Sequence, residues 1–430
     1  MSQRNRWRRL LGEGSWVVAG QAASVLGSLV MIRVLTELLS PSAYGELTLG
    51  LTVAALANQI IFGPLAGGVT RFYAPAAEKA ALRTFLHSSQ ALLLQATGMV
   101  LLLAMVTWAV AWAIGQVHLM PLLSLAMMLS ILAGINAVLG GLQSAARQRF
   151  VVALSQGFEP WLRIAAISVL AGVLGSSSET ALLGYVLSMM FIVLYQGHLL
   201  HRLRESTIRP PVEAQNTWRR DILSVTLPTS LYGFFTWLQL SSDRWALQWF
   251  SSTADVGLYA VVYQLGYYPI TLLGGMLVQF LMPIAFQRVG DASDPQRRRA
   301  MERLAWRAGV LVMLLTALGF GASHWLHAEI LGLFAQRDYG SVSYLLPWMV
   351  MSGGLLATGQ TLALILQSNL RTAELSRAKI GSSIIGIVAN LLAAHWFGLA
   401  GIVGAGVLSA GLYAGWMMLL TRASSVHHSQ

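Results

Sequence analysis

The chain has 430 residues, of which 56% are hydrophobic and only 10% are charged, and its mean hydropathy is +0.62. Because a soluble globular protein carries about 25% charged residues, the composition excludes a soluble domain and predicts a polytopic membrane protein. Cysteine is absent, which excludes disulfides and thiolate metal sites.

The apolar runs of the chain predict about twelve membrane-spanning helices, since one helix needs about 20 mainly apolar residues. In chain order they cover 15–38, 45–68, 88–113, 119–142, 151–174, 180–200, 222–249, 257–285, 307–332, 343–367, 376–396 and 399–421. The first apolar run is too long for a cleavable signal peptide. We therefore expect an all-α fold in which the first helix is retained.

The net charge of +11 is concentrated in alternate connections between these helices. Basic loops stay cytoplasmic, so both chain ends are expected inside, as an even number of spans also requires. The charge is thus explained by membrane topology, and we expect no nucleic-acid partner. The outer connections are too short for an extracellular catalytic domain: Ser40–Tyr44, Gly115–His118, Gly175–Glu179 and Ser251–Val256.

Short motifs recur in the two halves of the chain in the same order. Leu142–Arg147 corresponds to Leu366–Arg371, Ser40–Gly45 to Ser252–Gly257, and Gly184–Ser188 to Ala405–Ser409. The recurrence predicts two pseudo-symmetric six-helix bundles around a central cavity. Such parallel repeats suit alternating access around a central site. The predicted domains are an N-terminal lobe 1–201, a cytoplasmic linker 202–220 and a C-terminal lobe 221–430.

Three arginines, Arg33, Arg163 and Arg244, lie inside predicted spans. A charge at the centre of a spanning helix costs roughly 2.5–3.5 kcal/mol on insertion scales. Each guanidinium is therefore expected to face protein, a water-filled cavity or an anionic partner. Under the repeat, Arg33 and Arg244 occupy nearly equivalent places and are expected to face each other across the cavity.

Each deep arginine also has a carboxylate nearby in sequence. Arg33 lies one helical turn before Glu37, and Glu159 one turn before Arg163. A self-neutralising ion pair and a functional cavity charge both remain open for these pairs. Asp243 and Arg244 are adjacent, so their side chains point about 100° apart and are not expected to face one partner squarely.

Uncharged polar residues recur within the predicted spans, where helix-to-helix hydrogen bonding is the usual role. They are Gln21, Asn58, Gln59, Asn136, Tyr232, Gln239, Gln264, Gln360 and Asn390. Two GxxxG spacings, Gly63–Gly67 and Gly411–Gly415, predict close helix packing.

The segments Arg33–Gly45, Asp243–Tyr259 and Gly401–Gly406 resemble motifs of the polysaccharide (O-antigen type) flippases. These belong to the multidrug/oligosaccharidyl-lipid/polysaccharide exporter superfamily. The resemblance implies two six-helix bundles that move undecaprenyl-diphosphate-linked oligosaccharide from the cytoplasmic to the periplasmic leaflet of a bacterial inner membrane. It also implies a cationic cavity, coupling to a proton or sodium gradient, and glycan polymerases as partners.

Candidate site residues follow from the charges and this resemblance. An arginine suits a diphosphate because its planar fork forms bidentate, charge-assisted hydrogen bonds. The expected substrate-binding residues are Arg33, Arg163 and Arg244, with Arg71, Arg147 and Arg371 at cytoplasmic helix ends, where topogenic charge is the alternative. The expected ion-coupling residues are Glu159 and Asp243.

The sequence contains no Walker A loop, nucleophile elbow or HExxH motif, so we expect neither an enzyme nor a bound cofactor or metal. Two alternatives remain. A drug/cation antiporter of the same superfamily would favour carboxylates in its cavity. A membrane glycan polymerase or ligase would be expected to carry a large outward loop.

Overall fold

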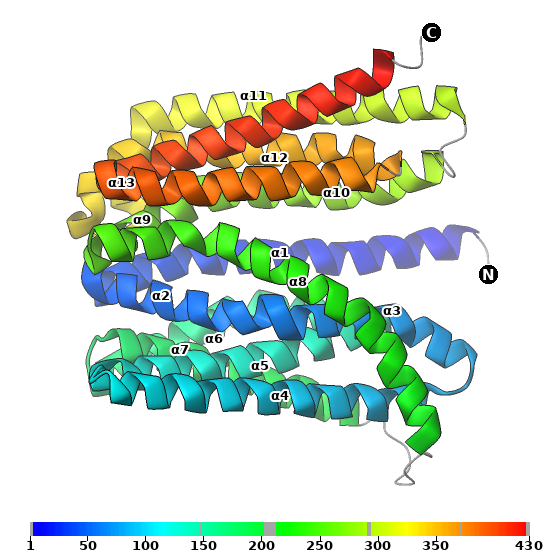
Figure 1. Ribbon diagram of the computed structural model, residues 1–430, viewed down its shortest axis with the longest axis horizontal. Helices are drawn as coiled ribbons and strands as arrows, with labels where there is room; N and C mark the ends of the chain where they lie inside the picture. The colour runs from blue at the N-terminus through cyan, green and yellow to red at the C-terminus, as the bar shows by residue number, and fades with distance from the viewer. Residues whose placement is uncertain (1–2, 147, 202–211, 290–293, 370, 427–430) are drawn as a thin grey trace. The chain divides into compact units, whose positions relative to one another are not determined.

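The computed structural model describes residues 3–146, 148–201, 212–289, 294–369 and 371–426, and within these ranges it contains helices and turns but no strand (Figure 1). Contacts divide the chain into two compact units. The first unit comprises Met1–Leu39 and Glu46–Trp237, and the second comprises Ser40–Gly45 and Leu238–Gln430. The expected all-α membrane fold is confirmed.

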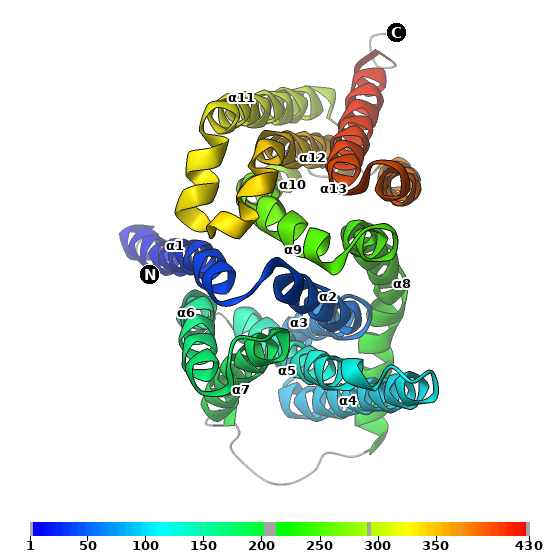
Figure 2. The same cartoon turned by 90° about the vertical axis from the view of Figure 1, so that its left-hand side faces the viewer.

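The first unit contains six whole α-helices, most of α2 and part of α8 among its described residues. They are α1 (Gln3–Leu38), α2 (Pro41–Ala57), α3 (Gly63–Glu78), α4 (Leu82–Ala113), α5 (Met120–Ala145), α6 (Arg149–Leu174), α7 (Ser178–His201) and the beginning of α8 (Val212–Phe250), with a π-helical turn η1 (Asn58–Phe62) and a 3-10 turn η2 (Val117–Leu119). Helix α1 packs on α6, α6 on α7, and α7 on α5, as the end-on view shows (Figure 2).

Small residues allow α1 to approach α6 closely. A Cβ atom at Gly20 would lie 2.6 Å from the Ala153 carbonyl oxygen, and one at Gly27 would lie 2.8 Å from Pro160 Cβ. The indole Nε1 of Trp161 donates a hydrogen bond to the carbonyl oxygen of Ala23 over 3.1 Å. Together these contacts fix the face that α6 presents to the rest of the unit.

The second unit is built around α12. Its elements are the first turn of α2, the end of α8, α9 (Thr253–Val262), η3 (Tyr263–Tyr267), α10 (Tyr268–Val289), α11 (Pro295–Phe334), η4 (Arg337–Leu345), α12 (Leu346–Ser368) and α13 (Thr372–Val426). Most of α12 is buried, and α10, α11 and α13 all pack on it. Glycines on α12 make this possible, because a Cβ atom at Gly353 or Gly354 would clash with the Tyr267 backbone or the Thr316 side chain.

Ten helical segments among the described residues are long and apolar enough to cross a membrane, so the predicted number of twelve is not confirmed. The predicted spans 376–396 and 399–421 lie in one element, α13, which would be about 80 Å long if straight at about 1.5 Å per residue. It breaks at Gly398, where φ is 56°, a conformation that glycine adopts readily. Figure 1 shows the chain reversing there.

The predicted span 222–249 lies in α8, which is not among the ten. Serine, threonine and the Asp243–Arg244 pair lower the apolar character of this helix. It begins at Val212, inside the segment predicted as a linker, and continues without a break to Phe250. The predicted lobe boundaries stay a prediction.

Polar residues join helices within both units, as the sequence predicts. In the first unit, Asn58 donates to the Ser130 carbonyl over 3.3 Å and Gln196 donates to Asn136 over 2.7 Å. In the second, Ser383 donates to Gln239 over 2.7 Å and Asn390 donates to Ser242 over 3.0 Å. The prediction from GxxxG spacing is wrong at Gly67 and Gly415, where a Cβ atom would meet none of the described side chains within 4 Å.

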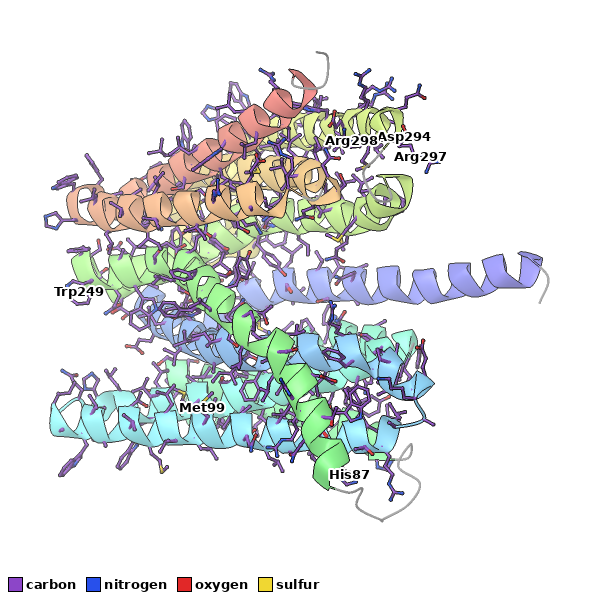
Figure 3. All side chains as sticks on the ribbon, turned by 45° about the vertical axis from the view of Figure 1, so that its right-hand side comes forward. His87, Met99, Trp249, Asp294, Arg297 and Arg298 are labelled. Atoms are coloured by element: carbon purple, nitrogen blue, oxygen red, sulfur yellow. The ribbon has the colours of Figure 1, made fainter. Side chains whose placement is uncertain are left out.

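Figure 3 shows Met99 on α4, Trp249 at the end of α8, and the charged side chains of Asp294, Arg297 and Arg298 together at the start of α11. Met99 on α4 and Trp249 at the end of α8 are 53% and 84% exposed, as expected for side chains that contact lipid. At the start of α11, Asp294 caps the helix by accepting from the Gln296 amide over 2.8 Å. Its carboxylate also pairs with Arg297 at 3.2 Å.

Candidate functional site

A partly buried ion pair lies at the centre of α6 in the first unit. Nη2 of Arg163 donates to the Glu159 carboxylate one turn earlier, and the two side chains are only 20% and 22% exposed. The guanidinium carbon of Arg163 lies 4.1 Å from the centre of the Tyr185 ring on α7. The arginine is thus held by a carboxylate and an aromatic face, both from its own unit.

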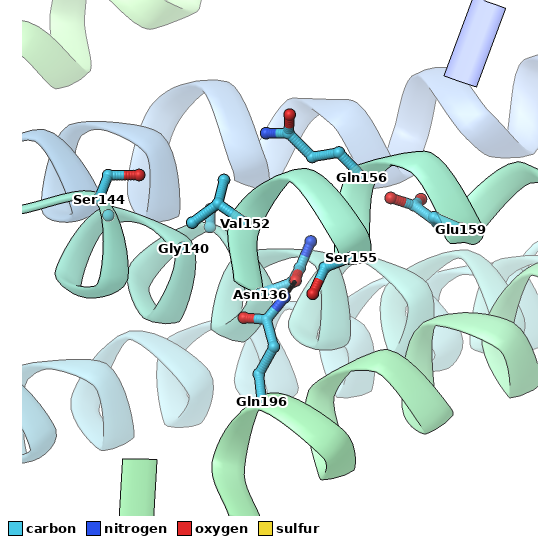
Figure 4. A pocket seen from close by; sticks show the side chains of 10 residues that line it. Asn136, Gly140, Ser144, Val152, Ser155, Gln156, Glu159 and Gln196 are labelled. Atoms are coloured by element: carbon cyan, nitrogen blue, oxygen red, sulfur yellow. Dashed lines mark hydrogen bonds between the residues drawn. The ribbon is translucent and has the colours of Figure 1, made fainter. Parts of the chain in front are cut away.

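A polar pocket of about 290 Å³ lies beside this pair, between α5, α6 and α7 (Figure 4). Its polar lining consists of Asn136, Ser144, Ser155, Gln156, Glu159 and Gln196. The Ser155 hydroxyl and the Gln196 side-chain carbonyl are buried and have no hydrogen-bond partner among the described residues. Buried polar groups of this kind are usually satisfied by water, so the pocket is suited to hold water beside the Glu159 carboxylate.

A second charged cluster lies in the second unit, where α8 meets α9. The Asp243 carboxylate accepts from the Tyr259 hydroxyl over 2.6 Å and from Nη1 of Arg244 over 3.2 Å. Nη1 of Arg244 also donates to the Leu240 carbonyl over 2.7 Å. The guanidinium carbon lies 4.4 Å from the centre of the Tyr263 ring.

The adjacent charges of this cluster meet, although the sequence predicts side chains that point apart. The Arg244 side chain folds back along α8, and both residues then contact Tyr259, because its hydroxyl reaches Asp243 and its ring centre lies 5.8 Å from the guanidinium carbon. Only 12% of the Arg244 side chain is exposed. Little of this guanidinium is therefore accessible to a ligand.

The remaining candidate arginines that the structure describes lie on α1, α3 and just before α13. Nε of Arg33 donates to Glu37 over 2.7 Å, and 39% of its side chain is exposed. Arg71 is exposed on α3. Nε of Arg371 donates to Glu374 over 2.7 Å. Arg147 lies outside the described residues.

The sequence did not lead us to expect the tyrosines that contact the charged residues of both clusters. Tyr259, Tyr263 and Tyr267 recur every four residues along one helical face, which is a signal that the sequence contains. Tyr185 is part of one of the recurring motifs but has no comparable spacing to mark it. Aromatic faces stabilise a cation where hydration is lost, so a deep arginine is itself a reason to look for them.

The fold is that of the transporters of the MOP superfamily. An inward-facing multidrug resistance MATE transporter aligns with 95% of this chain and 98% of its own, at a TM-score of 0.69 and 15% identity. The inward-closed lipid II flippase MurJ aligns over 96% and 87%, with a TM-score of 0.68 and 11% identity.

A MOP superfamily transporter from Pyrococcus furiosus, described by the reverse polarity of its binding pocket, aligns over 95% of this chain and 94% of its own, with a TM-score of 0.59 and 16% identity. Residues 10–289 match the family of polysaccharide biosynthesis proteins, and the chain belongs to that family. No curated protein matches the sequence.

Proposed function

We propose that this protein is a flippase that moves an undecaprenyl-diphosphate-linked oligosaccharide across a bacterial inner membrane by alternating access. The observation that carries the proposal is a polysaccharide biosynthesis family match on a chain whose fold is shared with a lipid II flippase. Family membership favours a glycan as cargo, and the fold favours transport between leaflets. Both chain ends are cytoplasmic in this proposal, because the basic connections lie on that side.

The accessible arginines support recognition of a diphosphate. Arg33 is the most exposed of the three deep arginines, and we assign it the first contact with the phosphate oxygens. Arg71, Arg147 and Arg371 would receive the lipid headgroup at the cytoplasmic side. Arg163 and Arg244 remain substrate-binding candidates, and their neutralised, buried positions favour a weaker contribution.

Glu159 is the stronger candidate for coupling to a cation gradient. Its carboxylate lines a pocket suited to hold water, which gives a proton or sodium ion a polar environment beside it. Asp243, the second candidate, is only 10% exposed and is already held by Tyr259 and Arg244. We therefore assign coupling first to Glu159.

A drug/cation antiporter of the same superfamily is the second candidate, favoured by the fold match to MATE transporters. The family match favours the flippase. An enzyme that polymerises or transfers glycans is the weakest alternative, because the connections predicted on the outer side are short. Glycan polymerases are instead proposed as partners that consume the flipped substrate.

The test is reconstitution of the purified chain in liposomes that contain fluorescent undecaprenyl-diphosphate-linked N-acetylglucosamine. Reduction of the label from outside by dithionite reports the lipid that has crossed. We expect the wild-type chain to raise the crossing rate at least tenfold over empty liposomes, and Arg33→Ala to lower it. Export of a cationic dye such as ethidium, with no movement of the lipid, would favour the antiporter.

The coupling assignment is tested in the same liposomes with an imposed proton or sodium gradient. Glu159→Gln should retain some crossing but lose its response to the gradient. A variant with the full gradient response would remove Glu159 from coupling. Asp243→Asn, prepared in parallel, tests the second carboxylate.

A further inference from the structure

A row of tyrosines runs along α9 and η3 in the second unit. Tyr259, Tyr263 and Tyr267 lie on one face, and the rings of Tyr263 and Tyr267 are stacked, with centres 4.6 Å apart and planes inclined by 25°. Tyr259 precedes them with its ring centre 5.9 Å from that of Tyr263. The row therefore presents aromatic faces rather than hydroxyl groups alone.

The local helix geometry at this row is unusual. Tyr263–Tyr267 form the π-helical turn η3, and π-helical turns are rare and frequently occur at functional sites. The backbone of η3 is fixed from behind, since the Tyr267 carbonyl lies only 2.7 Å from where a Cβ atom of Gly353 would be. The stacked rings are thus carried on a tightly packed backbone.

Accessibility increases along the row. Tyr259 is 4% exposed, whereas Tyr263 and Tyr267 are half-buried. Within the described part of the chain, Tyr263 is the only ring stacked on Tyr267. A ligand could therefore reach the Tyr267 end of the stack but not the Tyr259 end.

The depth of the row suits a transported substrate. Tyr263 and Tyr267 follow the start of α9 at Thr253 by about 15–21 Å, at about 1.5 Å per residue. Half of a bilayer core of about 30 Å is about 15 Å, so the stack lies near the membrane centre. Substrate sites of secondary transporters lie at that depth.

The charges around the stack select the class of ligand. Arg244 already occupies the face of Tyr263 at 4.4 Å, so a second cation would meet like charge. Its charge is compensated by Asp243 at 3.2 Å, so an additional anion gains little. A neutral ligand therefore suits these aromatic rings better than a charged one. A hexopyranose is such a ligand, because its apolar C–H face can stack on an aromatic ring and its hydroxyl groups lie at the edge.

We propose that Tyr267, backed by the stacked ring of Tyr263, forms a stacking subsite for a sugar ring of the lipid-linked glycan. Arg244 is a positioning residue that holds Tyr263 in place, and Asp243 holds Arg244. This inference rests on the proposed function, because it names the part of the cargo that the second unit recognises. Stacking on a C–H face is shared by many hexoses, so the subsite would tolerate changes in sugar identity.

The proposal is tested by native mass spectrometry of the full chain with an equimolar mixture of undecaprenyl diphosphate and undecaprenyl-diphosphate-linked N-acetylglucosamine. The ratio of the two adducts measures the preference for the sugar. We expect the wild-type chain to favour the glycosylated lipid about tenfold, equivalent to about 1.4 kcal/mol. Tyr267→Leu and the double variant with Tyr263→Leu should bring the ratio close to one and leave binding of undecaprenyl diphosphate unchanged.

Matched variants separate stacking from a structural role. The double variant Tyr263→Phe with Tyr267→Phe retains both rings and should keep the preference. Tyr195→Leu removes a spanning tyrosine on α7 that is 37% exposed and should also keep it. If the double leucine variant does not fold, Tyr267→Leu decides alone, since Tyr267 lies at the accessible end.

The failures of the two proposals are distinguishable. A wild-type ratio of one, or a leucine variant with the wild-type preference, overturns the sugar subsite while undecaprenyl diphosphate still binds. A wild-type chain that binds neither lipid contradicts the proposed function and overturns the subsite with it.

Discussion

At the residue scale, breaking the deep ion pair of Glu159 and Arg163 should destabilise the protein more than breaking the accessible pair of Arg33 and Glu37. Glu159→Ala leaves the Arg163 charge in a mostly buried position, which destabilises a protein by about 3–5 kcal/mol when a pair is fully buried. Because these side chains are about one-fifth exposed, we expect a loss near the lower end of that range. Thermal unfolding of the purified chain in detergent measures the loss.

The control for this prediction is the pair of Arg33 and Glu37, which is 39% and 51% exposed. Glu37→Ala should change the free energy of unfolding by less than about 1 kcal/mol. Removing both charges with Glu159→Gln and Arg163→Met should recover part of the loss. Equal effects of Glu159→Ala and Glu37→Ala would show that the α6 pair is well hydrated.

The hydroxyl of Tyr259 should also contribute to stability, because it donates a hydrogen bond to the Asp243 carboxylate over 2.6 Å in a buried position. Tyr259→Phe removes this donor and keeps the ring. We expect a loss of about 1–3 kcal/mol in the free energy of unfolding, the usual effect of leaving a buried polar group with one partner fewer. Tyr268→Phe, at an exposed ring, should have no measurable effect in the same assay.

At the element scale, the recurring motifs meet where α2 and α9 begin. A Cβ atom at Gly45 would lie 1.9 Å from the Thr253 carbonyl oxygen, and one at Gly257 would lie 2.0 Å from that of Pro41. The two helix starts therefore touch through equivalent glycines. Gly45→Ala and Gly257→Ala should each lower thermal stability, since no flexible side chain is available to move aside.

Glycines in open positions provide the comparison. Gly67 on α3 and Gly275 on α10 have none of the described side chains within 4 Å of a new Cβ atom. Alanine there should raise stability by up to about 1 kcal/mol, because glycine is the poorer helix former. If all four alanine variants changed the stability by the same amount, the close contact at Gly45 and Gly257 would not contribute to stability.

Sequence periodicity predicted the helices but not which glycines bring them together. Apolar length identifies a spanning segment without reference to its neighbours, so helices such as α4 and α12 were predictable. The GxxxG spacing at Gly63–Gly67 was misleading, because close approach depends on what faces the glycine from another helix. For the same reason the ion pairs of Arg33 and Arg163 were predictable from spacing, while the Tyr185 ring above Arg163 was not.

At the scale of the whole molecule, the membrane orientation is the property that the charge pattern predicts most directly. The charge pattern predicts that the basic residues at the start of α11 and around Arg371 lie on the same membrane side as the N-terminal arginines. Translocating those loops would oppose the positive-inside preference. The natural absence of cysteine makes the orientation measurable, because each introduced thiol is then unique.

Single cysteines test both units in intact cells with a membrane-impermeant maleimide. Ser176→Cys in the first unit and Ser341→Cys in the second lie at exposed connections that we predict to be on the outer side, and should react from outside. Glu78→Cys and Ala373→Cys, at exposed positions beside basic connections, should react only after the membrane is permeabilised. The reverse pattern would place the basic loops outside, and the cytoplasmic arginines proposed to receive a lipid-linked diphosphate would then face the wrong compartment.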